Sequence, residues 1–125
     1  MPSDKNVANI NTINRLLDIM ARLRSPTDGC EWDLAQDFES ISRYTIEEAY
    51  EVADAIQSGS SSSIKDELGD LLLQVVFHSQ IAADKNLFVF DDVCNAISDK
   101  MERRHPHIFG NTQAPDVKKQ WEEIK

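Results

Sequence analysis

Hydrophobic residues recur at helical spacing along most of this chain. Leucine, isoleucine and methionine repeat every three or four positions over residues 9–24, and similar patterns cover residues 45–57, 64–84 and 91–104. Such spacing places the apolar side chains on one face of an α-helix, and no alternating pattern long enough for a β-strand occurs. The sequence therefore predicts an all-α fold, an antiparallel bundle of four to five helices whose last, short helix would lie near residues 117–124.

Polar and small residues mark the expected ends of these helices. The segment SPTDG at 25–29 should break the first helix, and a loop should follow it. Thr45 and Glu48 have the spacing of a capping box, which predicts that the second helix begins at Thr45. The serine-rich run 58–63 predicts a short turn, after which the third helix folds back antiparallel on the second. Pro106 should end the fourth helix.

The predicted third helix is apolar on two sides. One face holds Leu68, Leu71, Leu72, Val75 and Val76, and the other holds Leu73, Phe77 and Ile81. A helix of this kind needs two partners, because a soluble monomer rarely leaves such a patch exposed. We therefore expect a homodimer that forms through the second face, with a higher oligomer as the alternative.

Length and composition indicate a single domain. The chain has 125 residues, of which 41% are hydrophobic, and we expect one domain over residues 1–125 with residues 1–8 as a disordered leader. No apolar run approaches the roughly 20 residues that cross a bilayer, and the N-terminus lacks the apolar stretch of a secretory signal. The sequence thus predicts a cytoplasmic protein with no membrane partner, in which Cys30 and Cys94 remain thiols.

The charge balance of the chain is acidic. Its formal net charge is -9, from 22 acidic and 13 basic residues. Nucleic-acid binders rely on basic residues that neutralise phosphates, so this balance argues against a nucleic-acid partner. Scattered acids would indicate only solubility, whereas carboxylates that are forced together repel one another and need a cation.

Two pairs of acids are spaced to face each other across the predicted hairpin. Glu48 and Glu51 are three residues apart on the second helix, and Glu67 and Asp70 are three apart on the third. Each pair lies on one helix face, and antiparallel packing can bring the pairs together. Four clustered carboxylates would destabilise the fold unless a cation neutralised them, and Mg2+ prefers oxygen ligands. The four acids are therefore a candidate magnesium site.

A purely structural explanation of these acids is also open. Glu48 could simply cap the second helix together with Thr45, and Glu-x-x-Glu pairs are common on solvated helix faces. The second pair favours a site, because Glu67 and Asp70 lie within an apolar run where a merely solvated face is not expected.

Four short motifs occur together in this sequence: GCxWD at 29–33, EExxE at 47–51, ELGDLL at 67–72 and ISDKMERRHPH at 97–107. In this combination the chain resembles the MazG-type nucleoside triphosphate pyrophosphohydrolases from about Ile13 to Lys125, and in particular the N-terminal copy of their domain. The resemblance implies an all-α, usually dimeric fold that cleaves nucleoside triphosphates to monophosphate and pyrophosphate. It also implies that Mg2+, with Mn2+ as an alternative ion, is held by Glu48, Glu51, Glu67 and Asp70.

Further residues are candidates for handling the nucleotide substrate. Glu47 or one of the metal ligands could orient and deprotonate the attacking water. Lys100 and Arg104 share a helix face, with Arg103 beside them, and could hold phosphate charge, although the helix dipole also favours cations in a last turn. Trp32 could stack on a nucleobase or could instead plug the core.

Two hypotheses about function remain. The first is magnesium-dependent hydrolysis of nucleoside triphosphates, or of related nucleotides, to monophosphate and pyrophosphate. The second is a catalytically weak nucleotide-binding or dimerisation domain that supports a second MazG domain. The four acids favour the first hypothesis. The single copy of the domain favours the second, as do two departures from the usual family loop, namely Glu31 in place of a proline and Asp37-Phe38 after Gln36.

Overall fold

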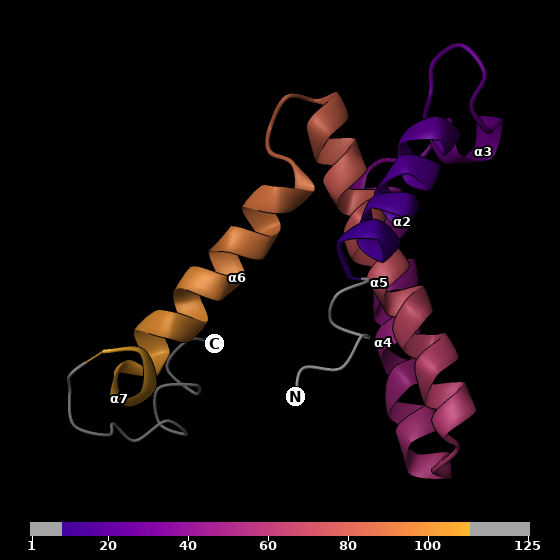
Figure 1. Ribbon diagram of the computed structural model, residues 1–125. Coiled ribbons are helices and arrows are strands. Elements are labelled where there is room, and N and C mark those ends of the chain that lie inside the picture. The colour runs from indigo at the N-terminus through magenta and orange to yellow at the C-terminus, as the bar shows by residue number, and fades with distance from the viewer. Residues whose placement is uncertain (1–8, 111–125) are drawn as a thin grey trace. The chain divides into compact units, whose positions relative to one another are not determined.

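The computed structural model describes residues 9–110, and these residues form helices and no strands. The helices are α2 (Asn9–Leu23), α3 (Glu31–Leu34), α4 (Phe38–Ser58), α5 (Ser61–Asp84), α6 (Phe90–Arg104) and α7 (Pro106–Phe109) (Figure 1). The all-α prediction is confirmed, and the two four-residue helices, α3 and α7, are additions that are too short to show a hydrophobic period. The predicted leader at 1–8 and last helix near 117–124 lie outside the described residues.

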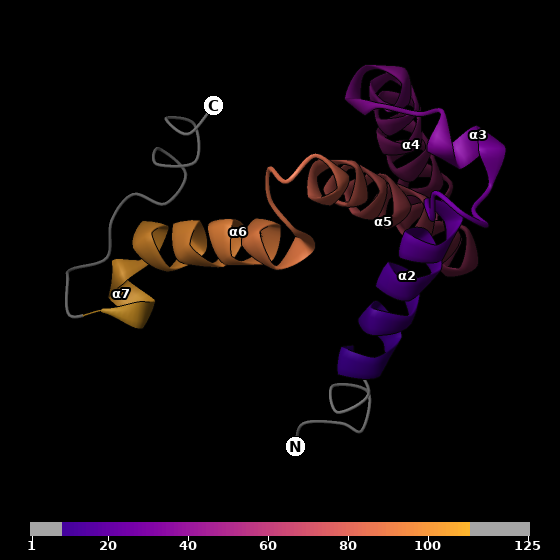
Figure 2. The same cartoon turned by 90° about the horizontal axis from the view of Figure 1, so that it is seen from above.

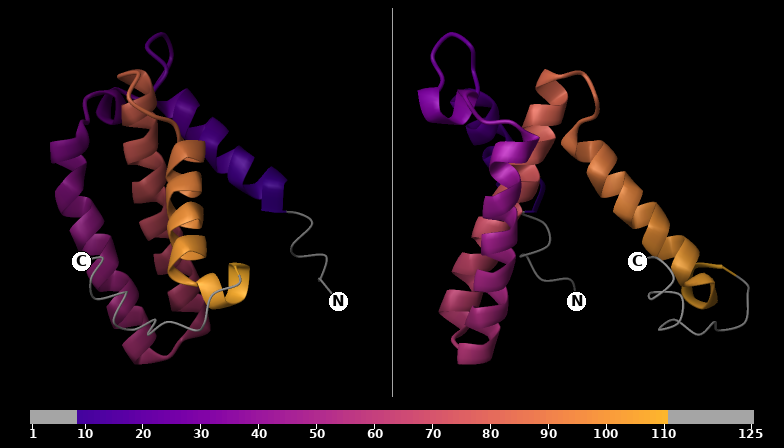
Figure 3. Two further views of the ribbon diagram at one scale, coloured as in Figure 1. Left: turned by 90° about the vertical axis from the view of Figure 1, so that its left-hand side faces the viewer. Right: turned by 180° about the vertical axis from the view of Figure 1, so that it is seen from behind.

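No helix within the described residues has both the length and the apolar content needed to cross a membrane. The chain divides into two compact units, with the division between Leu87 and Phe88. The first unit contains α2 to α5, and the second contains α6 and α7. In the second unit α6 ends before Pro106, as predicted, and α7 continues from the end of α6 (Figure 3). A single domain over residues 1–125 stays a prediction.

An antiparallel hairpin of α4 and α5 forms the centre of the first unit (Figure 3). The hairpin turns at Gly59, whose φ of 81° lies in the left-handed region that glycine adopts without strain. Ser60 then caps α5, because its hydroxyl oxygen accepts the backbone N–H of Ser63 at 3.3 Å. Helix α2 packs across α5 (Figure 2). The largest fully buried side chains of the core come from these three helices and are Met20, Ile41, Val76 and Ile81.

Helix α4 begins seven residues earlier than predicted, at Phe38 and not at Thr45. Asp37 is its N-cap: the Asp37 carboxylate accepts the N–H of Ser40 at 2.8 Å, and the Ser40 hydroxyl accepts the N–H of Asp37 at 2.9 Å. This reciprocal pair uses serine where the usual motif has glutamate or glutamine, so the sequence motif at Thr45 was misleading. The hydrogen bond from Ser40 holds the pKa of Asp37 below its ordinary value.

The predicted association face of α5 is also wrong. Phe77 and Ile81 are 4% and 0% exposed, and Leu73 is half-buried, so this face packs inside the first unit and cannot dock a second copy. The exposed apolar side chains of α5 are instead Leu68, Leu72 and Val75, which are 38% to 48% exposed. The prediction misassigned the faces because Trp32 and Arg24, far away in sequence, cover Phe77. A homodimer remains a prediction.

Arg24 ties the short helix α3 to the rest of the first unit. Its Nε donates to Asp84 Oδ2 at 2.8 Å, and its Nη1 donates to the backbone oxygens of Asp33 at 2.6 Å and Gln36 at 3.1 Å. The guanidinium also lies over the ring of Phe77, 5.9 Å from the ring centre. This side chain is only 9% exposed, so its bonds satisfy carbonyls that water reaches poorly. Arg24 therefore sets the position of α3 against α5.

Gly29, in the turn between α2 and α3, should resist substitution. A Cβ there would lie 2.5 Å from the backbone oxygens of Leu23 and Ser25, closer than atoms of this kind approach. We expect Gly29→Ala to lower the free energy of unfolding by about 1–3 kcal/mol, as overpacking does. The matched control is Gly69→Ala in α5, where a Cβ meets nothing within 4 Å. Alanine should raise stability there by about 0.5–1 kcal/mol. Urea unfolding measures both, and equal effects at the two sites would contradict this account.

Candidate active site

Three carboxylates converge between α4 and α5. Glu48 comes from α4, Glu67 and Asp70 come from α5, and one carboxylate oxygen of each lies within 4.8 Å of the others. Oxygen ligands around one magnesium ion at about 2.1 Å lie roughly 3 to 4 Å apart. Because Glu48 and Glu67 are half-buried and Asp70 is exposed, small rotations of these side chains would close the remaining gap. The donor set fits a hard divalent cation that keeps some positions open to other oxygens.

The protonation of this cluster reflects burial and mutual repulsion. Burial raises the pKa of Glu48 first, and the negative charges of Asp70, Glu67, Glu51 and Glu47 raise it further. The pKa of Glu67 is raised by the same causes, burial first and then Asp70 and Glu51. Both carboxyls therefore hold protons more readily than they would in water, and a bound cation would remove that penalty.

Two of the predicted acids lie beside the cluster and not within it. Glu51 is exposed on α4, and its oxygens are not among the three that converge, although its charge raises the pKa values of Glu48 and Glu67. Glu47 is exposed next to Glu48. Roles for Glu51 as a ligand and for Glu47 as a base stay predictions.

A cavity of about 180 Å³ opens beside Glu48, among α2, α3, α4 and α5. Its lining is mainly apolar and aromatic, with Trp32, Tyr44 and Phe77 supplying rings. Trp32 is 52% exposed and makes edge contacts with Tyr44 and Phe77, with ring centres 6.1 and 6.4 Å apart. Trp32 therefore packs against the core through its edge contacts, which is one of its two predicted roles, and leaves half of its surface open. Stacking on a nucleobase stays a prediction.

A hydrogen-bonded group of Thr45, Gln74 and His78 adjoins this cavity through Gln74, and sequence reasoning missed the part of Thr45 in it. The Thr45 hydroxyl is 3.0 Å from Gln74 Oε1 and 2.9 Å from His78 Nε2. The ring of Phe38 stacks on His78 with centres 5.8 Å apart, and burial lowers the pKa of His78. The sequence did contain a signal, because Gln74 and His78 continue the polar stripe of Glu67 and Asp70 along α5. The misplaced start of α4 hid the partner, Thr45.

Comparisons with known proteins show the family of this chain. Residues 36–109 match the MazG nucleotide pyrophosphohydrolase domain. The chain belongs to the MazG family. The nucleoside triphosphate pyrophosphohydrolase of Escherichia coli K12 is 52% identical over 119 residues, which are 93% of this chain and 45% of that protein. The Thermotoga maritima protein named nucleoside triphosphate pyrophosphohydrolase/pyrophosphatase MazG is 50% identical over 110 residues, 88% of this chain and 42% of that protein. This MazG chain thus spans less than half the length of these curated relatives.

The predicted phosphate-binding cations of this MazG chain belong to the second unit. Lys100 and Arg104 are half-buried on α6, where their spacing of four residues puts them on one face, and Arg103 is exposed. The Nε of Arg104 is buried and has no hydrogen-bond partner among the described residues. The shared face is as predicted, while service to the acidic site stays a prediction.

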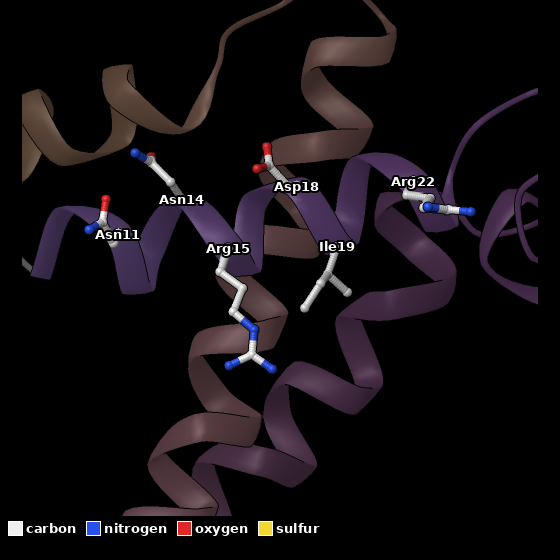
Figure 4. A pocket seen from close by; sticks show the side chains of 6 residues that line it. All are labelled: Asn11, Asn14, Arg15, Asp18, Ile19 and Arg22. Atoms are coloured by element: carbon white, nitrogen blue, oxygen red, sulfur yellow. The ribbon is translucent and has the colours of Figure 1, made fainter. Parts of the chain in front are cut away.

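A larger hollow, of about 450 Å³, lies along α2 of the MazG chain and offers less chemistry. The described residues that line it all come from that one helix, and Asn14 and Asp18 point to one side while Arg15 and Ile19 point to the other (Figure 4). Side chains that diverge from a single helix do not enclose a ligand. The smaller cavity beside Glu48 is therefore the better candidate.

Magnesium should stabilise the wild-type chain through the three acids. A ligand that binds only the native state raises stability by RT ln(1 + [L]/Kd), so millimolar Mg2+ should raise the melting temperature. Asp70→Asn removes one ligand charge and should shrink that shift. Glu39→Gln removes an exposed acid in the first turn of α4 and should leave the magnesium-induced shift unchanged. Thermal melts with and without Mg2+ measure the shift, and an Asp70→Asn protein with the full shift would exclude this site.

The metal-free protein should reveal the same repulsion through pH. The raised pKa values of Glu48 and Glu67 give stability that is fully present below the unfolded value, near 4.5, and is lost as pH rises through the folded pKa. Asp70→Asn removes one cause of those shifts. The variant should therefore melt above wild type at pH 7, and its advantage should shrink at pH 5.

Comparing the two proteins at each pH isolates the acidic cluster. His78 and Asp37 have lowered pKa values, so the stability that they contribute to the fold is lost as pH falls. This loss is the same in both proteins. The measurement is a thermal melt in chelator at pH 5 and pH 7. A difference between the proteins that is the same at both pH values would argue against the cluster.

Proposed function

We propose that this domain hydrolyses nucleoside triphosphates to nucleoside monophosphate and pyrophosphate with a bound divalent cation, Mg2+ or alternatively Mn2+. The observation that carries the proposal is that Glu48 belongs both to the three converging carboxylates and to the lining of the aromatic cavity. A site for phosphates at the carboxylates would therefore adjoin a site for a base in the cavity. The E. coli and T. maritima relatives, which are named for this activity, support the same reaction.

Glu48, Glu67 and Asp70 would hold the cation, and Glu51 would join them as the fourth acid. When bound, the ion would neutralise phosphate charge and lower the pKa of water. Glu47, which is exposed next to Glu48, would take the proton of the attacking water. Lys100 and Arg104, with Arg103, would hold the remaining phosphate charge.

The cavity would take the nucleobase. Its volume of about 180 Å³ is below the roughly 300 Å³ at which pockets begin to enclose a drug-sized ligand. It therefore suits one part of a nucleotide, with sugar and phosphates directed towards Glu48. The open surface of Trp32 would stack on the base, as aromatic side chains do on any base face.

A second candidate is a catalytically weak domain that supports another MazG domain. It is favoured by the coverage of less than half of the E. coli relative. The unusual loop residues do not add to it, because Asp37 caps α4, Phe38 stacks on His78 and Glu31 starts α3. We also propose that the protein is cytoplasmic and that it forms a homodimer. The exposed apolar side chains of Leu68, Leu72 and Val75 support the homodimer.

The reaction is tested by the products formed from a panel of triphosphates with Mg2+. We expect monophosphate and pyrophosphate from the wild-type chain, a loss of at least a hundredfold in kcat/KM for Glu48→Gln, and little change for Glu39→Gln. Ion chromatography resolves the products. Release of diphosphate and orthophosphate would overturn the reaction, and nucleotide binding without turnover would favour the supporting domain.

A further inference from the structure

Gln74 is a buried residue of the aromatic cavity, and its amide nitrogen has no partner among the described residues. The residue is 8% exposed and lines the cavity from α5. Its Oε1 lies 3.0 Å from the Thr45 hydroxyl, whereas its Nε2 makes no hydrogen bond to any described residue. An amide nitrogen carries two donors, and that of Gln74 keeps some contact with solvent. A ligand in the cavity would displace that solvent, and a donor that loses water without gaining a partner costs free energy. A ligand with an acceptor at this point would satisfy the donor.

The hydrogen-bonded group beneath Gln74 determines which end of the amide faces the cavity. The Thr45 hydroxyl has one proton and lies 2.9 Å from His78 Nε2, 3.0 Å from Gln74 Oε1 and 3.3 Å from the backbone oxygen of Ile41. When His78 Nε2–H donates to the Thr45 oxygen, the Thr45 proton can be donated to Gln74 Oε1, which is the nearer of the two remaining acceptors. The amide oxygen is then engaged, and the Nε2 donors remain for the cavity. The stacked ring of Phe38 holds the imidazole in place.

We propose that Gln74 selects the base by donating from Nε2 to an exocyclic oxygen, at position 4 of a pyrimidine or position 6 of a purine. The inference rests on the proposed nucleotide site and adds its specificity. Uracil, thymine, hypoxanthine and guanine have an oxygen at these positions, whereas cytosine and adenine have an amino group. An amino group would face the amide donors and leave buried groups on both sides unpaired, which is how hydrogen-bonding sites reject an analogue.

Gln74 supplies the one side-chain amide among the described residues that line the cavity, whose other polar groups come from Trp32, Asp33, Tyr44 and Glu48. Met20, Leu23, Ile41 and Leu73 are apolar and offer shape without hydrogen bonds. The Tyr44 hydroxyl accepts a hydrogen bond from Arg43 at 3.1 Å and keeps its own proton as a donor. Glu48 belongs to the acidic cluster. Gln74 also lies four residues from Asp70 on α5, so the amide and the cation ligand are one helical turn apart on a single rigid element.

Matched nucleotide pairs test the proposal. UTP and CTP differ at position 4, and ITP and ATP differ at position 6, so kcat/KM ratios within each pair isolate the group that Gln74 reads. We expect wild type to favour UTP over CTP, and ITP over ATP, by roughly five- to fiftyfold. Gln74→Leu should bring both ratios close to one. Gln80→Leu is the control, because it makes the same change on α5 where the amide donates to Asp84.

A second variant tests the proposal if Gln74→Leu fails to fold, and a binding measurement tests it if turnover is lost. Thr45→Val keeps the side-chain shape, releases the Gln74 amide, and should lower the ratios while the far-ultraviolet circular dichroism stays helical. Calorimetry with UMP and CMP gives the same ratio without catalysis. If the oxo and amino nucleotides are used or bound equally by wild type, this inference fails and the proposed function stands. If no nucleotide binds or reacts, both fail.

Discussion

The packing of α4 against α5 is the constraint on which the site depends. It forces Glu48 to share a small space with Glu67 and Asp70, and the raised pKa values of the two glutamates record the cost of doing so. Burial of apolar side chains from the three main helices opposes that repulsion, at roughly 1.5 to 3 kcal/mol for each fully buried aliphatic side chain. The acids are thus held together by a core that does not need them.

The cavity depends on a different kind of contact. Its outer wall includes Trp32 on α3, a helix of only four residues that cannot be stable alone. Arg24 holds that helix through two carbonyls and joins it to α5 through Asp84. A charged side chain just after α2 therefore positions an aromatic wall, whereas the acidic cluster is positioned by apolar packing.

The long helices were predictable because each is periodic over many residues, and the converging acids were predictable because their spacing survives any small error in helix ends. The start of α4 was not, because Asp37 and Ser40 form a cap that departs from the usual motif. The burial of Phe77 was not predictable either, because the residues that cover it, Trp32 and Arg24, lie more than forty positions away in sequence. The role of Thr45 was missed because of the misplaced start of α4, since a residue taken for a cap is in fact the centre of a hydrogen-bonded group with Gln74 and His78.

The spacing of Asp70 and Gln74 has a geometric consequence for any nucleotide that the site accepts. Four residues of α-helix separate the cation ligand from the amide by about 6 Å along the axis, and a helix of this length does not stretch. Helix α5 would therefore fix the distance between the phosphates bound near Asp70 and the base bound at Gln74. A molecule whose sugar is replaced by a longer or shorter spacer would reach one of these two positions and miss the other, even if its base and its phosphates were unchanged.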